Sequence, residues 1–140
     1  MHSRPTRPGR WLARTLTLPL LFATLVASGT TAYAAEGAEA ASTCTARYRR
    51  EGVEVWVSFR NIAPTTVNGW TLSWALADSQ QIWTIWNAAL VSHTGGIATV
   101  RDLGWNANLA PGVEMTIGYI AGGNAPPSGF ALNGDPCQAG

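Results

Sequence analysis

From Cys44 onward, short segments of alternating apolar and polar residues are separated by glycine, proline and asparagine. The clearest alternation runs over Gly52–Arg60: one parity holds Val53, Val55, Val57 and Phe59, and the other holds Glu54, Trp56 and Ser58. A period of two predicts a β-strand whose valine and phenylalanine face is buried. The same pattern predicts strands over Trp70–Ala77 and Glu114–Ile120.

Three further segments, residues 81–91, 97–102 and 130–132, are expected to be strands because turn-forming residues bound them. Helical periodicity is absent from residue 35 onward. Many short strands cut by turns indicate an all-β protein. We therefore expect an antiparallel β-sandwich of the jelly-roll or immunoglobulin-like type.

The first part of the chain has a different pattern. Residues 1–14 contain four arginines and no acid, residues 15–31 are mostly apolar, and Ala32-Tyr33-Ala34 follows. This order predicts a secretory signal peptide over residues 1–34. A transmembrane anchor is the alternative, but the apolar run is short and contains Pro19 and Gly29. We expect a disordered stub over residues 35–43 and a domain over residues 44–138, secreted, monomeric and free of the membrane after cleavage.

Removal of the signal peptide changes the charge balance. Five arginines and no lysine remain against eight acidic residues, a net charge of about −3. The only basic cluster, Arg47, Arg49 and Arg50, is expected to be a solvated strand end. Binding to nucleic acid needs a dense basic face, so nucleic acid is excluded as a partner.

Two cysteines, Cys44 and Cys137, lie near the two ends of the expected mature chain. In an oxidising compartment such a pair forms a disulfide. A metal site is a weaker alternative because no histidine lies near either cysteine, and a catalytic cysteine is weaker still. We expect one disulfide that joins the two ends of the domain, and neither a metal ion nor a cofactor.

Tryptophan is unusually abundant, since six of the seven tryptophans remain after cleavage. Trp70 and Trp74 share the parity of neighbouring leucines and are expected in the core. Trp86 and Trp105 lie beside small and polar residues, with little apolar sequence against which to pack. We expect the indoles of Trp86 and Trp105 to be exposed.

Two tryptophans are less simple to place. Trp56 lies on the polar parity of its strand, whereas Trp83 has the opposite parity to Trp86, and a bulge could put it on either face. An exposed tryptophan in a secreted protein is a liability unless it binds something, and a flat indole matches the C–H face of a pyranose ring. The tryptophans therefore predict polysaccharide binding, with the covering of the sandwich ends as the alternative role.

Catalysis lacks a recognisable set of residues. Glycoside hydrolysis needs two carboxylates across a cleft, but the acids of the expected domain are scattered at turns and strand ends. His93 lies in an expected turn without a serine and acid motif. A copper-dependent lytic oxidase would need an N-terminal histidine, whereas cleavage is expected to leave Ala35 first. We expect a binding protein and not an enzyme.

Ordered motifs across most of the expected mature chain resemble the family 2 carbohydrate-binding modules of bacterial cellulases and xylanases. Cysteines lie near both ends, as in the family. Asn68–Trp74 is similar to the family's NGWTLTW, and Phe130–Cys137 is similar to its FxLNGxxC. Two further stretches match its surface-tryptophan segments: Gln80–Ile82 followed by Trp86–Ala88, and Gly104–Gly112. The resemblance implies a β-sandwich with a flat aromatic face that binds cellulose, and in some members chitin or xylan. It also implies that Trp86 and Trp105 bind the polymer, that Thr84 and Asn106 are polar helpers, and that Trp70 is structural.

The chain departs from this family in two places. Members usually carry another surface tryptophan in the hairpin after the first cysteine, but Thr45–Glu51 has none. We hypothesise that Trp56 substitutes for it. The loop over Ile120–Asn124 is also shorter than the corresponding family loop.

The sequence therefore predicts a secreted, non-catalytic module that adsorbs to insoluble polysaccharide, with cellulose favoured. The alternatives within this class are a chitin- or xylan-binding module and the binding domain of a truncated glycoside hydrolase. A sandwich that binds protein through its tryptophans is a further alternative.

Overall fold

The computed structural model describes residues 41–140. The predicted signal peptide and residues 35–40 of the predicted stub lie outside the described residues. Ser42 already contacts the domain, because its hydroxyl donates to the Pro136 carbonyl at 2.8 Å. Among residues 41–140, no helix is long and apolar enough to span a membrane.

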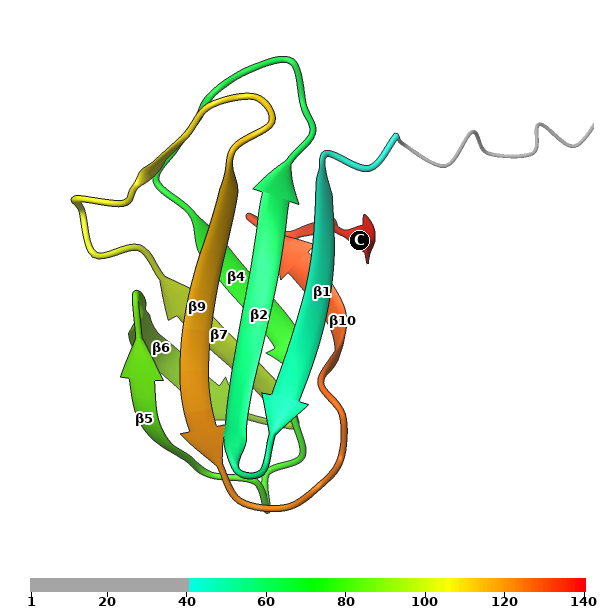
Figure 1. Ribbon diagram of the computed structural model, residues 1–140, viewed down its shortest axis with the longest axis vertical. Helices are drawn as coiled ribbons and strands as arrows, with labels where there is room; N and C mark the ends of the chain where they lie inside the picture. The colour runs from blue at the N-terminus through cyan, green and yellow to red at the C-terminus, as the bar shows by residue number, and fades with distance from the viewer. Residues whose placement is uncertain (1–40) are drawn as a thin grey trace, which may run out of the picture. The chain divides into compact units, whose positions relative to one another are not determined.

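The strands form two five-stranded sheets (Figure 1). The front sheet has the order β12–β1–β2–β9–β5, with β12 Gln138–Ala139, β1 Cys44–Glu51, β2 Glu54–Asn61, β9 Glu114–Ala121 and β5 Ile82–Trp86. The back sheet has the order β11–β10–β4–β7–β6, with β11 Asp135–Pro136, β10 Ser128–Leu132, β4 Thr71–Ala75, β7 Ile97–Arg101 and β6 Ala89–Thr94. A small third sheet pairs β3 Val67–Asn68 with β8 Asn108–Leu109. The predicted all-β sandwich is confirmed. Among residues 41–140, β1 and β12 are the one pair of parallel strands.

The core lies between the two large sheets and follows the predicted parity. Val55, Val57 and Phe59 of β2 are fully buried. Trp70 and Trp74 are also buried, as predicted, and the Trp70 ring meets the edge of Phe59 at a centroid distance of 5.0 Å. Aromatic and β-branched side chains therefore fill the space between the sheets, where burial of their apolar surface stabilises the fold.

A disulfide joins Cys44 to Cys137, as expected. Cys44 is fully buried at the start of β1. The last residues of the chain add β12 beside β1 in the front sheet, where Thr45 pairs with Gln138. The two ends of the domain are thus joined both by sulfur and by main-chain hydrogen bonds.

Two strand expectations were incomplete. Residues 45–51 were expected to be a short hairpin, but Cys44–Glu51 is a full strand that pairs with β2 along its whole length. Residues 81–91 were expected to be one strand, but the chain forms β5 in the front sheet and β6 in the back sheet. The change of sheet occurs at Asn87, which has a positive φ of 60°. Asparagine tolerates this left-handed conformation better than most residues.

Candidate tryptophan-bearing face

The outward side of the front sheet carries the candidate site. Side chains alternate between the two faces of a strand, so the residues next to the buried positions of β2 and β9 point outward. The register places Trp56 of β2 and Trp86 of β5 on either side of Gly118 of β9. Two tryptophans that are distant in the sequence therefore share one row of the sheet.

Trp56 and Trp86 stack on each other in this row. Their ring centroids are 5.6 Å apart and their planes differ by 13°. Trp86 is exposed to 36%, whereas Trp56 is partly buried. The stack makes one aromatic unit out of two side chains, and Trp56 holds Trp86 in place.

Gly118 makes the close approach of the two rings possible. A Cβ atom at this position would lie 2.7 Å from Cζ3 of Trp56 and 2.9 Å from Cε3 of Trp86. These distances are far below van der Waals contact, so any side chain here would displace at least one ring. Sequence reasoning missed Gly118, because its position opposite two tryptophans depends on the order of the strands.

Trp105 is the most exposed tryptophan in the described part of the chain, at 72%. It lies in the loop between β7 and β8. Asp102 fixes the start of this loop: its carboxylate accepts hydrogen bonds from the main-chain N–H of Gly104 at 2.8 Å and of Trp70 at 3.0 Å. The hydrogen bond from Gly104 has the larger effect and that from Trp70 the next, and both lower the pKa of Asp102. The exposed indole therefore stands on a well-anchored loop.

Asn106 connects the Trp105 loop to the end of β5. Its Oδ1 accepts from the Leu103 N–H and its Nδ2 donates to the Asn87 carbonyl, both at 2.8 Å. Asn87 in turn donates through Nδ2 to the Thr116 carbonyl of β9 at 3.0 Å. This chain of hydrogen bonds holds Trp105 next to the strand that carries Trp86.

Asn106 was expected to be a polar helper beside the tryptophans, and the structure places its side chain inside the protein. Only 4% of the residue is exposed, and both polar atoms of its side chain have partners inside the protein. Asn106 therefore positions the loop. The other expected helper, Thr84, is exposed and lies one row from Trp86, opposite Ile120.

Trp83, which the sequence left open, is exposed to 63%. The register of β5 with β9 shifts between Ile82 and Thr84, so Trp83 is the unpaired residue of a β-bulge.

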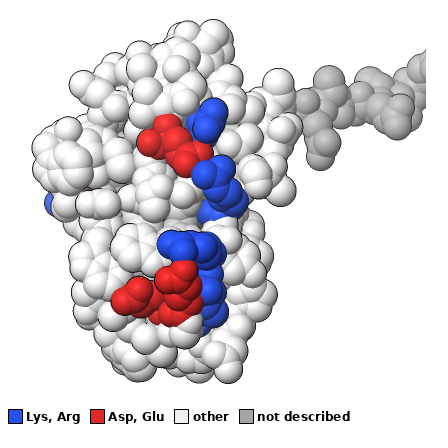
Figure 2. Space-filling view, in the orientation of Figure 1, with Lys and Arg blue, Asp and Glu red and all other residues white. Residues whose placement is uncertain are grey.

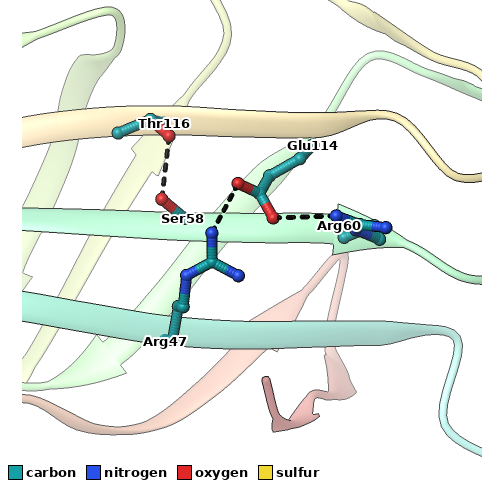
Figure 3. A network of polar contacts seen from close by, with 5 residues as sticks. All are labelled: Arg47, Ser58, Arg60, Glu114 and Thr116. Carbon is teal, nitrogen blue, oxygen red and sulfur yellow. Dashed lines mark hydrogen bonds and ion pairs between the residues drawn. The ribbon is translucent and has the colours of Figure 1, made fainter.

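The charged residues of this face pair with one another beside the tryptophans. Glu114 accepts from Arg47 at 2.8 Å and from Arg60 at 3.4 Å, and the hydroxyls of Ser58 and Thr116 are 2.8 Å apart (Figure 3). Figure 2 shows that acidic and basic side chains lie together over β1, β2 and β9, whereas the β5 side of the face is almost free of charge. The charges beside the tryptophans are thus paired with one another.

An open groove of about 360 Å³ lies beside Trp56. Its lining consists of Arg47, Tyr48, Arg49, Trp56, Ser58, Glu114 and Thr116. Among residues 41–140, no group of three or more histidine, cysteine or acidic side chains is placed to hold a metal ion. The arrangement offers stacking and hydrogen bonding to a ligand that lies on the surface.

A small β-sandwich that displays indoles on one sheet face has the features of a surface-binding domain. The family model described as "Cellulose binding domain" matches residues 38–137. The chain belongs to this family of carbohydrate-binding domains, as the motifs of the sequence predicted.

Similar proteins agree with this assignment. Chitinase C of Streptomyces lividans is 33% identical over 127 residues, which are 91% of this chain and 20% of the relative. Exoglucanase A of Cellulomonas fimi is 34% identical over 104 residues, which are 69% of this chain and 12% of the relative. The chain therefore spans a fifth or less of the length of these two enzymes.

Two solved structures with the same fold have more than 25% sequence identity to this chain. The chitin-binding domain of Chi18aC from Streptomyces coelicolor has a TM-score of 0.53 at 28% identity, covering 69% of this chain and 96% of that domain. The cellulose-binding family 2 domain of ScLPMO10C has a TM-score of 0.52 at 26% identity, covering 72% and 100%. The chain is thus homologous to both cellulose- and chitin-binding modules.

Proposed function

We propose that the described domain adsorbs to insoluble polysaccharide, with cellulose favoured, by stacking Trp86 and Trp105 on pyranose rings. Trp56 supports this contact through its stack with Trp86. Thr84 adds a hydroxyl next to the aromatic surface. Because the stack on Trp56 already orients the Trp86 indole, binding costs this side chain little conformational entropy.

One observation carries the proposal: a hydrogen bond joins the Trp105 loop to the residue that follows Trp86 at the end of β5. The Asn106 side chain donates to the Asn87 carbonyl, which directly follows Trp86. A loop that merely covered the core would not need to expose 72% of an indole. The link keeps Trp105 beside Trp86 and supports a shared binding surface.

The proposal includes the setting of the domain. We infer that it acts outside the cell as a monomer, without catalytic activity of its own and without nucleic acid or membrane as partners. The predicted signal peptide and the acidic surplus of the remaining chain support this setting.

A depletion assay tests the function directly. Purified protein is mixed with microcrystalline cellulose, chitin or insoluble xylan, and the protein left in the supernatant is measured. Trp86→Ala and Trp105→Ala should each weaken adsorption about tenfold or more, because each removes one indole face from the contact. Circular dichroism checks that the variants fold. Wild-type protein that stays in solution with every polymer would refute the proposal.

Chitin is the second candidate ligand. Chitinase C and the chitin-binding domain of Chi18aC are among the similar proteins and favour it. The same assay separates the two polymers, since a chitin-directed domain would adsorb more strongly to chitin than to cellulose at equal surface area.

A further inference from the structure

Trp83 has no role in the proposed contact so far, although it is exposed to 63%. It is the extra residue of the β-bulge in β5, an edge strand of the front sheet. A bulge changes the direction of a side chain, so strand parity alone does not place it.

Gly122 locates the Trp83 ring at the end of β9. Ala121, the last residue of β9, is fully buried, whereas Trp83 is exposed to 63%. A Cβ atom at Gly122 would meet Cζ2 of Trp83 at 3.3 Å and Cη2 at 3.4 Å. The Trp83 indole therefore lies against Gly122, on the exposed surface at the end of β9.

Gly118, within β9, and Gly122, just after it, each lie next to a tryptophan ring. Gly118 lies beneath Trp56 and Trp86, and Gly122 lies beside Trp83. Four residues separate the glycines, which corresponds to at most about 13 Å for an extended chain. The link from Asn87 to Thr116 places the Trp105 loop on the other side of Gly118 from Gly122.

We propose that Trp83 is a third stacking residue, which extends the binding surface along β5 and β9. The order along this strip is Trp105, then Trp86 with Trp56, then Trp83. The proposal rests on the proposed function and deepens it: the ligand is an extended, uncharged polysaccharide chain that runs along the strands and contacts the strip at several sugar residues. The nearly charge-free β5 side of the face in Figure 2 fits such a ligand.

The stack of Trp56 on Trp86 is the reason to prefer Trp83 as the additional position. Trp56 is partly buried and stacks on Trp86, so the two rings act as one aromatic unit. In this proposal Trp56 supports Trp86 and Trp83 supplies the additional contact, whereas the hypothesis that Trp56 itself substitutes for the missing tryptophan stays a prediction.

The test compares Trp83→Ala with Val91→Ala. Val91 is a matched control, because it is 54% exposed and is the extra residue of a bulge in β6, an edge strand of the back sheet. Trp83→Ala should weaken adsorption to the preferred insoluble polymer about tenfold, the effect of losing one indole face. Trp83→Phe should recover much of the affinity, and Val91→Ala should adsorb as the wild type does. Binding of a disaccharide, measured by titration, should not change in Trp83→Ala.

A measurement on the wild type needs no variant. Tryptophans are oxidised with N-bromosuccinimide and the products are identified by peptide mass spectrometry. Adsorption to the polymer should protect Trp83 from oxidation together with Trp86 and Trp105. If Trp86→Ala loses adsorption while Trp83→Ala does not, and Trp83 stays reactive on the polymer, the inference on Trp83 is wrong and the proposed function stands. Wild-type protein that adsorbs to none of the polymers would overturn both.

Discussion

Trp56 and Trp86 stack at a centroid distance of 5.6 Å across Gly118, although each belongs to a different strand of the front sheet. The stack depends on a residue without a side chain in the strand between them. It fixes the orientation of Trp86 before any ligand arrives, and this lowers the entropy that binding would otherwise lose.

The first prediction concerns Gly118→Ala. The new Cβ would lie within 3 Å of both rings, so the stack must open. We expect the free energy of unfolding to fall by about 1–3 kcal/mol, the usual cost of overpacking, and adsorption to weaken. Chemical denaturation and the depletion assay measure the two effects.

Gly122→Ala is the matched comparison for this change. Its Cβ would meet the Trp83 ring at 3.3 Å, a contact that a small movement relieves. It should therefore disturb stability less than Gly118→Ala. Equal losses in both variants would argue against the packing role of Gly118.

The second prediction concerns Asn106→Ala. The change leaves the Leu103 N–H and the Asn87 carbonyl without their present partners. We expect a loss of about 1–3 kcal/mol in the free energy of unfolding. Adsorption should also weaken, because the Trp105 loop loses its link to β5.

Asn108→Ala serves as the control, since Asn108 is exposed in β8, two residues further along the chain. Titration calorimetry with a soluble oligosaccharide would separate the two roles considered for Asn106. A positioning residue raises the entropic cost of binding when it is removed. A loss of affinity at unchanged stability would point instead to direct contact with the sugar.

The third prediction is a loss of stability at alkaline pH. Burial raises the pKa of Tyr119 from 10.0 to about 12. Between these two values the unfolded state releases a proton that the folded state keeps, so this contribution is complete below pH 10 and is lost as the pH rises towards 12. The melting temperature of the wild type should therefore fall more steeply over this range than that of Tyr119→Phe. Parallel curves would show that Tyr119 does not contribute.

The fourth prediction concerns the Cys44–Cys137 disulfide, which links residues 93 positions apart. Replacing both cysteines by serine should lower the free energy of unfolding by roughly 3–5 kcal/mol, since the bridge restricts the unfolded chain. Adsorption below the melting transition should change little, because Cys44 is in β1 and the strip follows β5 and β9. A reducing agent should destabilise the wild type by a similar amount and leave the variant unaffected.

The strands and the core were predictable where a local pattern carries the information. Alternation over residues 52–60 and 114–120 depends on neighbouring residues alone, and the structure confirms both strands. The burial of Trp70 and Trp74 followed from the same parity. These features need no knowledge of which strand lies beside which.

The arrangement of the site was not predictable in this way. The contact of Trp56 with Trp86 requires the strand order β2–β9–β5. The direction of the Trp83 side chain depends on a bulge in β5, and the residue types of that segment do not predict the bulge. The change from β5 to β6 likewise depends on one positive φ at Asn87. The sequence therefore predicted the exposure of Trp86 and Trp105, but the stack and the strip depend on long-range register.

The pairing of β12 with β1 has a consequence for anything attached to the domain. In the front sheet, β12 and β5 form opposite edges, separated by four strand spacings or about 19 Å. A segment joined before Cys44 or after Gly140 would leave from the β12 edge, as the position of the C-terminus beside β1 suggests in Figure 1. A protein segment attached at either end of the domain would therefore be joined at the edge of the front sheet opposite β5. The indoles would then stay free to lie on a polymer surface.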